Sequence, residues 1–368
     1  MSIQSALPRR IVFHPLSCAE LGVVRGVLAK DRRFRLSHIG PYIAALAVNI
    51  QRKPFVEKTR ADVAATPDDW HLASPPVFVV GFWRSGTTLL HEMIAADRAF
   101  ASPLLLDILF PSDARYLQKY KRKALGAIAD VKTDETGAPI YPTRKVDLVE
   151  VSLERPQEEE LAMCHLAAPS FFRVSFFPRQ RAEHIDDALF AAPGSPAREA
   201  WRSAHRRFLK TLVNKYRGKR LLLKNPANST RVADLMEMYP NALFVRIDRE
   251  REATLKSFQR MMDLSIEQFS LQGSAKPFTR EEAEALHTRV LAKLDADWAT
   301  VPAERKTSLT YDTLVADPVK AVREVYRDLG LPLTKKIQLR QRRKWNKRVK
   351  HWSPKPAAEQ AGAEDVTP

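Results

Sequence analysis

Cysteine is scarce in this chain, which has two among its 368 residues. Cys18 and Cys164 lie far apart and neither belongs to a C-x-x-C pair, so the sequence predicts neither a disulfide framework nor a zinc site. Sparse cysteine without such patterns is typical of proteins in a reducing compartment. We therefore expect a cytoplasmic location.

Long hydrophobic runs are also missing. The longest apolar stretch, residues 39–50, is too short to span a bilayer. It predicts a core helix, and a helix lying in a membrane interface is the alternative because Arg52 and Lys53 follow it. The first residues lack an apolar segment with a small-residue cleavage site, so we expect no secretory signal.

Acidic residues are few relative to basic ones, with 43 Asp and Glu against 60 Lys and Arg, a formal net charge of +17. This imbalance implies an anionic substrate, a membrane surface or nucleic acid as a partner. Nucleic acid is the least favoured, because no motif for reading RNA or DNA bases is present. The 45% hydrophobic content is ordinary for a globular protein. The length suits one large α/β domain with an appendage or two domains, and we favour one domain.

The stretch from Pro75 to Leu90 predicts a strand, a loop and a helix in direct succession. Residues 77–80 are β-branched or aromatic, as in a strand buried on both faces of a parallel sheet. After Gly86, apolar residues recur at the spacing of one helix face. The free N–H groups and the dipole of a helix N-terminus favour an anion. The sequence therefore predicts a phosphate-binding loop.

This loop departs from the nucleotide-hydrolase pattern G-x-x-x-x-G-K-[ST]. Gly81 and Gly86 keep the spacing, but Thr87 stands where the lysine would be and Arg84 supplies the cation from within the loop. Such a site holds an anion through backbone, hydroxyl and guanidinium groups, with less need for a metal. An ATP-dependent P-loop kinase is thus disfavoured and is kept as an alternative.

The remaining sequence alternates strand and helix patterns, which predicts an α/β fold with a mostly parallel sheet flanked by helices. We expect three regions: an N-terminal helical cap (1–74), an α/β domain (75–334), and a basic segment with a disordered tail (335–368). Nine of the sixteen residues in 335–350 are Lys or Arg and none is acidic.

Two more strand ends carry cations. Lys224 ends an apolar strand, and Arg249 follows the strand 242–247, with Ser257 eight residues further on in a helix. Open parallel sheets bind ligands at the carboxyl ends of their strands. We expect Lys224, Arg249 and Ser257 to lie near the phosphate-binding loop.

Together, Arg84-Ser85-Gly86-Thr87-Thr88, Leu223-Lys224-Asn225-Pro226 with Arg231, and the Arg249–Ser257 pair resemble the bacterial sulfotransferase family, across roughly residues 75–330. The resemblance implies a P-loop-like fold and transfer of a sulfuryl group from 3′-phosphoadenylyl sulfate (PAPS), without a metal, to a hydroxyl or amine of a small molecule, carbohydrate or lipid. It implies donor-binding roles for Arg84, Ser85, Gly86, Thr87, Thr88, Arg249 and Ser257, and catalytic roles for Arg84 and Lys224.

The general base is less well defined by this resemblance. Some sulfotransferases use a histidine two residues after the strand-end lysine, but here that position is Pro226. Others use a glutamate about twenty residues after the loop, and in that region Asp107 is the only acid here. Asp107 is the first candidate. The group Glu158, Glu159 and Glu160 is the second, although acids in the first turn of a helix are more often structural.

The basic segment leaves a further alternative open. Residues 335–350, with Trp345 among the cations, predict either peripheral contact with an anionic membrane, at its inner face, or closure over the donor. A non-enzymatic protein that binds membranes or polyanions is therefore the runner-up outside enzymes.

Overall fold

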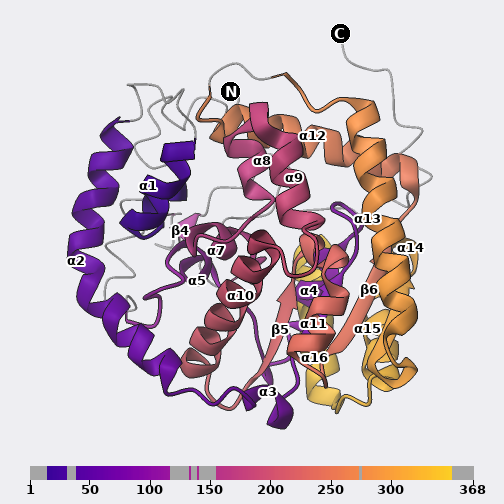
Figure 1. The fold of residues 1–368 in the computed structure, drawn as a ribbon. Coiled ribbons are helices and arrows are strands. Elements are labelled where there is room, and N and C mark those ends of the chain that lie inside the picture. Colours follow the sequence, from indigo (N-terminus) through magenta and orange to yellow (C-terminus); the bar gives the residue numbers. More distant parts are fainter. Residues whose placement is uncertain are drawn as a thin grey trace.

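The computed structural model describes residues 15–30, 39–116, 132–133, 139–140, 155–272 and 276–349. Its central sheet has five strands in the order β2-β5-β1-β6-β7, and every neighbouring pair is parallel. Helices flank this sheet (Figure 1). The predicted α/β fold with a mostly parallel sheet is confirmed.

The strands of the sheet are β1 (Val77–Val80), β2 (Phe100–Ala101), β5 (Arg220–Lys224), β6 (Leu243–Asp248) and β7 (Lys306–Thr310), and β3 (Lys132–Thr133) pairs with β4 (Pro139–Ile140) in an antiparallel ribbon. The α-helices are α1 (Leu21–Lys30), α2 (Ile39–Ala64), α3 (Trp70–Ala73), α4 (Thr87–Ile94), α5 (Leu105–Leu109), α7 (Glu160–His165), α8 (Phe172–Phe176), α9 (Arg181–Leu189), α10 (Pro196–Lys215), α11 (Val232–Met238), α12 (Arg251–Phe269), α13 (Arg280–Thr300), α14 (Tyr311–Ala316), α15 (Pro318–Asp328) and α16 (Lys335–Val349). Short 3-10 helices are η2 (Pro15–Cys18), η5 (Pro178–Gln180), η6 (Pro226–Thr230) and η7 (Ala303–Arg305).

Strand β1 lies at the centre of the sheet, between β5 and β6. All four of its side chains are fully buried, and they alternate between the two faces. Phe78 and Val80 join an apolar cluster that includes Phe208 of α10, whereas Val77 and Val79 join a cluster that includes Val322 of α15. A strand that is buried on both faces has a continuous run of apolar residues in its sequence. For this reason residues 77–80 could be predicted as a strand from the sequence.

The N-terminal helices pack beside α10 and form one side of the molecule (Figure 1). Arg52 of α2 makes a buried ion pair with Asp113 at 2.5 Å and donates a hydrogen bond to the carbonyl of Cys18. Leu16 and Cys18 also belong to the apolar cluster on the α10 side of the sheet. The division at residue 74 stays a prediction, and residues 1–14 lie outside the described part.

The basic segment forms α16, which packs on α15 and α4. Ile337 and Gln341 are buried, and Arg348 makes an ion pair with Glu92 of α4 at 2.6 Å. The opposite side of the helix is exposed and carries Lys335, Lys336, Leu339, Arg342, Arg343, Asn346, Lys347 and Val349. The tail predicted to be disordered, after residue 349, lies outside the described residues.

None of the helices in the described ranges is long and apolar enough to cross a membrane. The stretch 39–50 instead forms the first half of the 26-residue α2.

The turn that leaves β1 passes very close to β6. Gly81 has φ +146°, and a Cβ atom added there would lie 2.3 Å from the backbone carbonyl oxygen of Ile247. Its N–H donates a 2.9 Å hydrogen bond to the hydroxyl of Ser229 in η6. Gly86 has φ +100°, and a Cβ there would lie 2.6 Å from the ring of Tyr311. Only glycine fits both positions without displacing its neighbours.

We expect Gly81→Ala to lower the free energy of unfolding by about 2 kcal/mol or more, because a Cβ would meet backbone that cannot move away cheaply. Gly194→Ala is the matched control, since Gly194 also has a positive φ (+72°) but has nothing within 4 Å of the added Cβ. Urea denaturation of both variants measures the difference. Equal losses would contradict the close approach to Ile247.

Candidate active site

The loop 81–86 joins the carboxyl end of β1 to the N-terminus of α4. Its two aromatic residues point into an apolar cluster, with the Phe82 ring 5.0 Å from the Phe258 ring and the Trp83 ring 4.3 Å from the Phe171 ring. Both are nearly fully buried. Such packing anchors the loop, and Arg84, whose own φ is +69°, follows directly after it.

Arg84, Arg249 and Ser257 converge beside this loop, as predicted from the strand ends. The Nε of Arg84 donates a 2.8 Å hydrogen bond to the hydroxyl of Ser257, and Arg249 donates one of 3.0 Å to the carbonyl oxygen of Arg84. The Arg249 guanidinium also lies over the ring of Tyr311, 4.3 Å from its centroid. Two guanidinium groups and a hydroxyl thus meet where a phosphate oxygen could be bound.

The N-terminus of α4 adds hydroxyl groups to this arrangement. Ser85 is buried, and its Oγ has no hydrogen-bond partner among the described residues. Thr87 is buried and Thr88 is half-buried in the first turn of α4. A buried hydroxyl without a partner is costly unless a ligand or water satisfies it. These hydroxyl groups lie at a helix N-terminus, where an anion is favoured.

Lys224 lies beside the loop because β5 is the neighbour of β1. It is paired with Val79 in the sheet register, two residues before Gly81. Its side chain is 7% exposed and its Nζ donates a 2.9 Å hydrogen bond to Glu158, which is 26% exposed. Burial, and after it the charge of Lys224, lowers the pKa of nearby His91 to about 3, so this imidazole is neutral.

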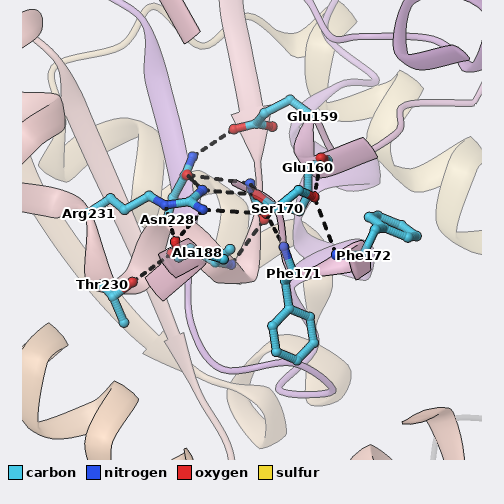
Figure 2. Close-up of polar contacts among 11 residues, drawn as sticks. Glu159, Glu160, Ser170, Phe171, Phe172, Ala188, Asn228, Thr230 and Arg231 are labelled. Carbon is cyan, nitrogen blue, oxygen red and sulfur yellow. Dashed lines mark hydrogen bonds and ion pairs between the residues drawn. The ribbon is translucent and has the colours of Figure 1, made fainter. Parts of the chain in front are cut away.

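Glu159 and Glu160 follow Glu158 and are buried next to η6 (Figure 2). Burial raises the pKa of Glu159 to about 7. Burial alone would also raise the pKa of Glu160, but the Arg231 guanidinium 3.0 Å away and the Asn225 amide hold it below its usual range. Two adjacent carboxyl groups therefore differ in their tendency to ionise.

Residues 75–335 match the family model described as the sulfotransferase family. The chain belongs to this family. Its parallel sheet, loop 81–86 and strand-end Lys224 all lie within the matched range.

Two curated relatives match this chain over 260 residues each. The proteins named omega-hydroxy-beta-dihydromenaquinone-9 sulfotransferase Stf3 from Mycobacterium bovis and Mycobacterium tuberculosis are each 26% identical over 260 residues. The match covers 71% of this chain and 64% of the relatives, so the chain spans less than two thirds of their length.

Two solved structures share the fold. Sulfotransferase STF9 from Mycobacterium avium has a TM-score of 0.63 at 18% identity, covering 92% of this chain and 84% of that one. Sulfotransferase STF1 from M. tuberculosis H37Rv has a TM-score of 0.55 at 19% identity, covering 94% of this chain and 88% of that one.

Asp107 in this sulfotransferase-family chain belongs to a different group of contacts. It is 1% exposed, accepts a 2.9 Å hydrogen bond from the N–H of Leu104, and pairs with Lys215 and with the Tyr216 hydroxyl. Lys215 and Tyr216 precede β5 (Arg220–Lys224) and Lys224 ends it, and this strand alone spans about 13 Å. Among the described contacts, none joins Asp107 to Lys224 or the loop, so its predicted role as base stays untested and its contacts favour a structural one.

Sequence reasoning missed Ser229 and ranked Glu158, Glu159 and Glu160 only second as candidates for the general base. Ser229, which accepts the hydrogen bond of Gly81, had no distinguishing pattern around it. Glu158, Glu159 and Glu160 were attributed to the dipole of the following helix, but Glu159 is the residue before α7 and makes no side-chain capping bond. Three consecutive acids in a chain with more basic than acidic residues were the available signal.

The described ranges contain no group of three or more His, Cys, Asp or Glu side chains arranged to hold a metal ion. Metal independence stays a prediction.

Proposed function

We propose that this protein transfers a sulfuryl group from PAPS to a hydroxyl or amine acceptor. The observation that carries the proposal is the convergence of loop 81–86, with its unpartnered Ser85 hydroxyl, and the Arg84–Ser257–Arg249 group at the strand ends beside Lys224. Membership in the sulfotransferase family supports it. Because the match covers only 64% of the relatives' length, their acceptor is not transferred to this chain, whose own acceptor is to be identified by experiment.

Sulfuryl transfer requires the protein to bind the negatively charged donor, to orient it and to stabilise the charge that develops. Sulfuryl transfer resembles phosphoryl transfer, in which a planar group moves in line while charge grows on the leaving phosphate oxygen. The α4 N-terminus and the Ser85, Thr87 and Thr88 hydroxyls would orient the 5′-phosphate. Lys224, fixed and nearly buried, would stabilise the growing charge electrostatically. Arg84 links the loop to the Ser257 side of the site, because its backbone belongs to the loop and its side chain contacts Ser257.

We expect the protein to bind adenosine 3′,5′-bisphosphate roughly a hundredfold more tightly than adenosine 5′-phosphate. Hydrogen bonds to charged groups contribute about 1.5–3 kcal/mol each, and 1.4 kcal/mol is a factor of ten. Arg249→Ala should remove most of this preference in competition binding. Arg251→Ala is the matched control, since Arg251 is a nearby arginine with a half-exposed side chain. Equal affinities for the two nucleotides in the unmodified protein would rule out a PAPS-type donor, and loss of activity on chelating divalent metals would favour a kinase.

For the general base we propose Glu158 in preference to Asp107. Its carboxylate is partly exposed and lies 2.9 Å from Lys224, so it is next to the group that would face the transferred sulfuryl. It would accept the proton of the acceptor hydroxyl, and Lys224 would hold it in place. Asp107, by contrast, is buried with three partners of its own.

Glu158→Gln should lower kcat by about 10²- to 10⁴-fold, the usual contribution of a general base. Asp107→Asn should lower thermal stability and leave kcat within a few-fold, because it loosens the contacts with Lys215 and Tyr216. Steady-state kinetics and thermal melting of both variants compare the two candidates. The reverse pattern would assign the base to Asp107.

We further propose that the acceptor is a lipid and that α16 brings the protein to an anionic membrane surface. The exposed side of α16 carries five cations, with Leu339 55% and Val349 37% exposed among them. Basic residues near an anionic surface contribute about 1 kcal/mol each at most. The relatives' name describes a sulfotransferase acting on a hydroxylated menaquinone, which supports a lipid acceptor.

The protein should therefore float with vesicles containing phosphatidylglycerol and stay unbound with phosphatidylcholine alone. The double variant Arg342→Glu, Arg343→Glu should reduce the bound fraction several-fold. The same reversal at Arg206 and Arg260, two exposed arginines on α10 and α12, is the control. If the α16 variant floated like the unmodified protein, the exposed side of α16 would be excluded as the membrane-binding surface. If the protein failed to float with vesicles and bound only an oligonucleotide, nucleic acid would be the partner.

A further inference from the structure

Three consecutive acids, Glu158, Glu159 and Glu160, each contact a different part of the segment 224–231. Glu158 binds Lys224 at the end of β5. Glu159 accepts a 2.7 Å hydrogen bond from the Asn228 amide. Glu160 accepts one of 2.7 Å from the Asn225 amide and pairs with Arg231. Figure 2 shows the two buried carboxylates directed at Asn228 and Arg231.

Helix capping and the helix dipole are the usual reasons for acids at the start of a helix, but they do not explain why Glu159 and Glu160 are buried. Helix α7 begins at Glu160 and has six residues, and the preceding Glu159 makes no side-chain capping bond. Glu159 is fully buried and Glu160 is 2% exposed. Burying two neighbouring carboxyl groups costs free energy unless their hydrogen bonds are satisfied. The side chains that bind these carboxyl groups belong to segment 224–231, and they leave one oxygen, Glu159 Oε2, without a hydrogen-bond partner among the described residues.

The same segment is tied to the phosphate-binding loop on its other side. The Ser229 hydroxyl accepts the 2.9 Å hydrogen bond of the Gly81 N–H, and Ser229 lies between Asn228 and Arg231 in the chain. Asn225 also accepts a 3.0 Å hydrogen bond from the N–H of Ala227, which closes the first turn of η6. Segment 224–231 therefore connects the carboxylates on one side to the loop on the other.

We propose that Glu159 and Glu160 are positioning residues, which hold η6 through Asn228, Asn225 and Arg231 and thereby fix the Lys224 ammonium relative to loop 81–86. Among the described contacts, neither carboxylate binds loop 81–86: Glu159 Oε1 accepts from Asn228, Glu159 Oε2 has no hydrogen-bond partner, and Glu160 accepts from Asn225, Arg231 and the N–H of Phe171. This role rests on the proposed sulfuryl transfer, because it assigns Lys224 a place beside the reacting group.

Glu159→Ala tests the role. It should lower kcat at least tenfold and change the donor KM and the affinity for adenosine 3′,5′-bisphosphate by much less, since Arg84, Arg249 and Ser257 keep their own contacts even if the Ser229–Gly81 bond loosens. Glu159→Gln should retain most of kcat, because its side-chain oxygen can still accept the Asn228 bond. Asn228→Ala should reproduce the Glu159→Ala effect, and the double variant should be little worse than either single one, as expected for two partners of one interaction.

Hydrogen–deuterium exchange supplies a readout that does not depend on activity. The amides of residues 225–231 should exchange faster in Glu159→Ala and Asn228→Ala than in Glu159→Gln. Asp113→Asn is the control for a general loss of stability, since Asp113 is fully buried in an ion pair with Arg52 far from this segment in the sequence. It should lower the Tm without faster exchange at 225–231 and without loss of kcat at a temperature where it is folded.

Two outcomes would overturn the proposal. One is unchanged exchange at 225–231 in Glu159→Ala. The other is faster exchange with kcat unchanged, which would make the contacts purely structural. If the unmodified protein transferred no sulfuryl group, the proposed function would fail by itself, and the exchange data would still decide whether the carboxylates hold this segment.

Discussion

The turn after β1 is confined on both sides by neighbouring chain, and the rest of the site depends on this constraint. Because β1 lies between β5 and β6, Gly81 meets the Ile247 carbonyl on one side and the Ser229 hydroxyl on the other. A loop held this closely presents its N–H groups in one arrangement. The strand ends that carry Lys224 and Arg249 come to the same edge of the sheet for the same reason, since parallel neighbours end together.

Charge is distributed unevenly over this framework. Around the loop, cations are held by specific partners: Lys224 by Glu158, and Arg84 by the Ser257 hydroxyl. On α16, cations lie on an exposed face without an acid in the helix. Fixed cations at a sheet edge suit transition-state charge, because they need no reorganisation when that charge appears. Exposed, mobile cations suit a broad anionic surface instead. The cations behind the net charge of +17 thus include two groups that differ in exposure and in their partners.

The acids near the site differ from one another through their surroundings rather than their chemistry. Glu158 reaches partly into solvent, Glu159 is buried with a raised pKa, and Glu160 is buried against Arg231 with a lowered one. Asp107 of α5 is equally buried but pairs with Lys215 and Tyr216, which precede β5. An acid with all its oxygens engaged by fixed partners is a poor proton acceptor for a bound hydroxyl, whereas one beside a single lysine is a better one.

The sequence by itself determined the strand, loop and helix of residues 77–94, the mostly parallel sheet and the family, because buried runs, glycine spacing and helix periodicity are local properties. It also indicated that Arg249 and Ser257 converge, since a strand end and the following helix are close in the chain. Only the tertiary structure decided that Arg84 contacts Ser257, 173 residues away, and that Lys224 contacts Glu158, 66 residues away. These pairs follow from the order of strands in the sheet, and a one-dimensional pattern of apolar and polar residues does not specify which strands become neighbours. The same limit explains why Asp107 was preferred to Glu158: distance along the chain from the loop says little about distance across a folded sheet.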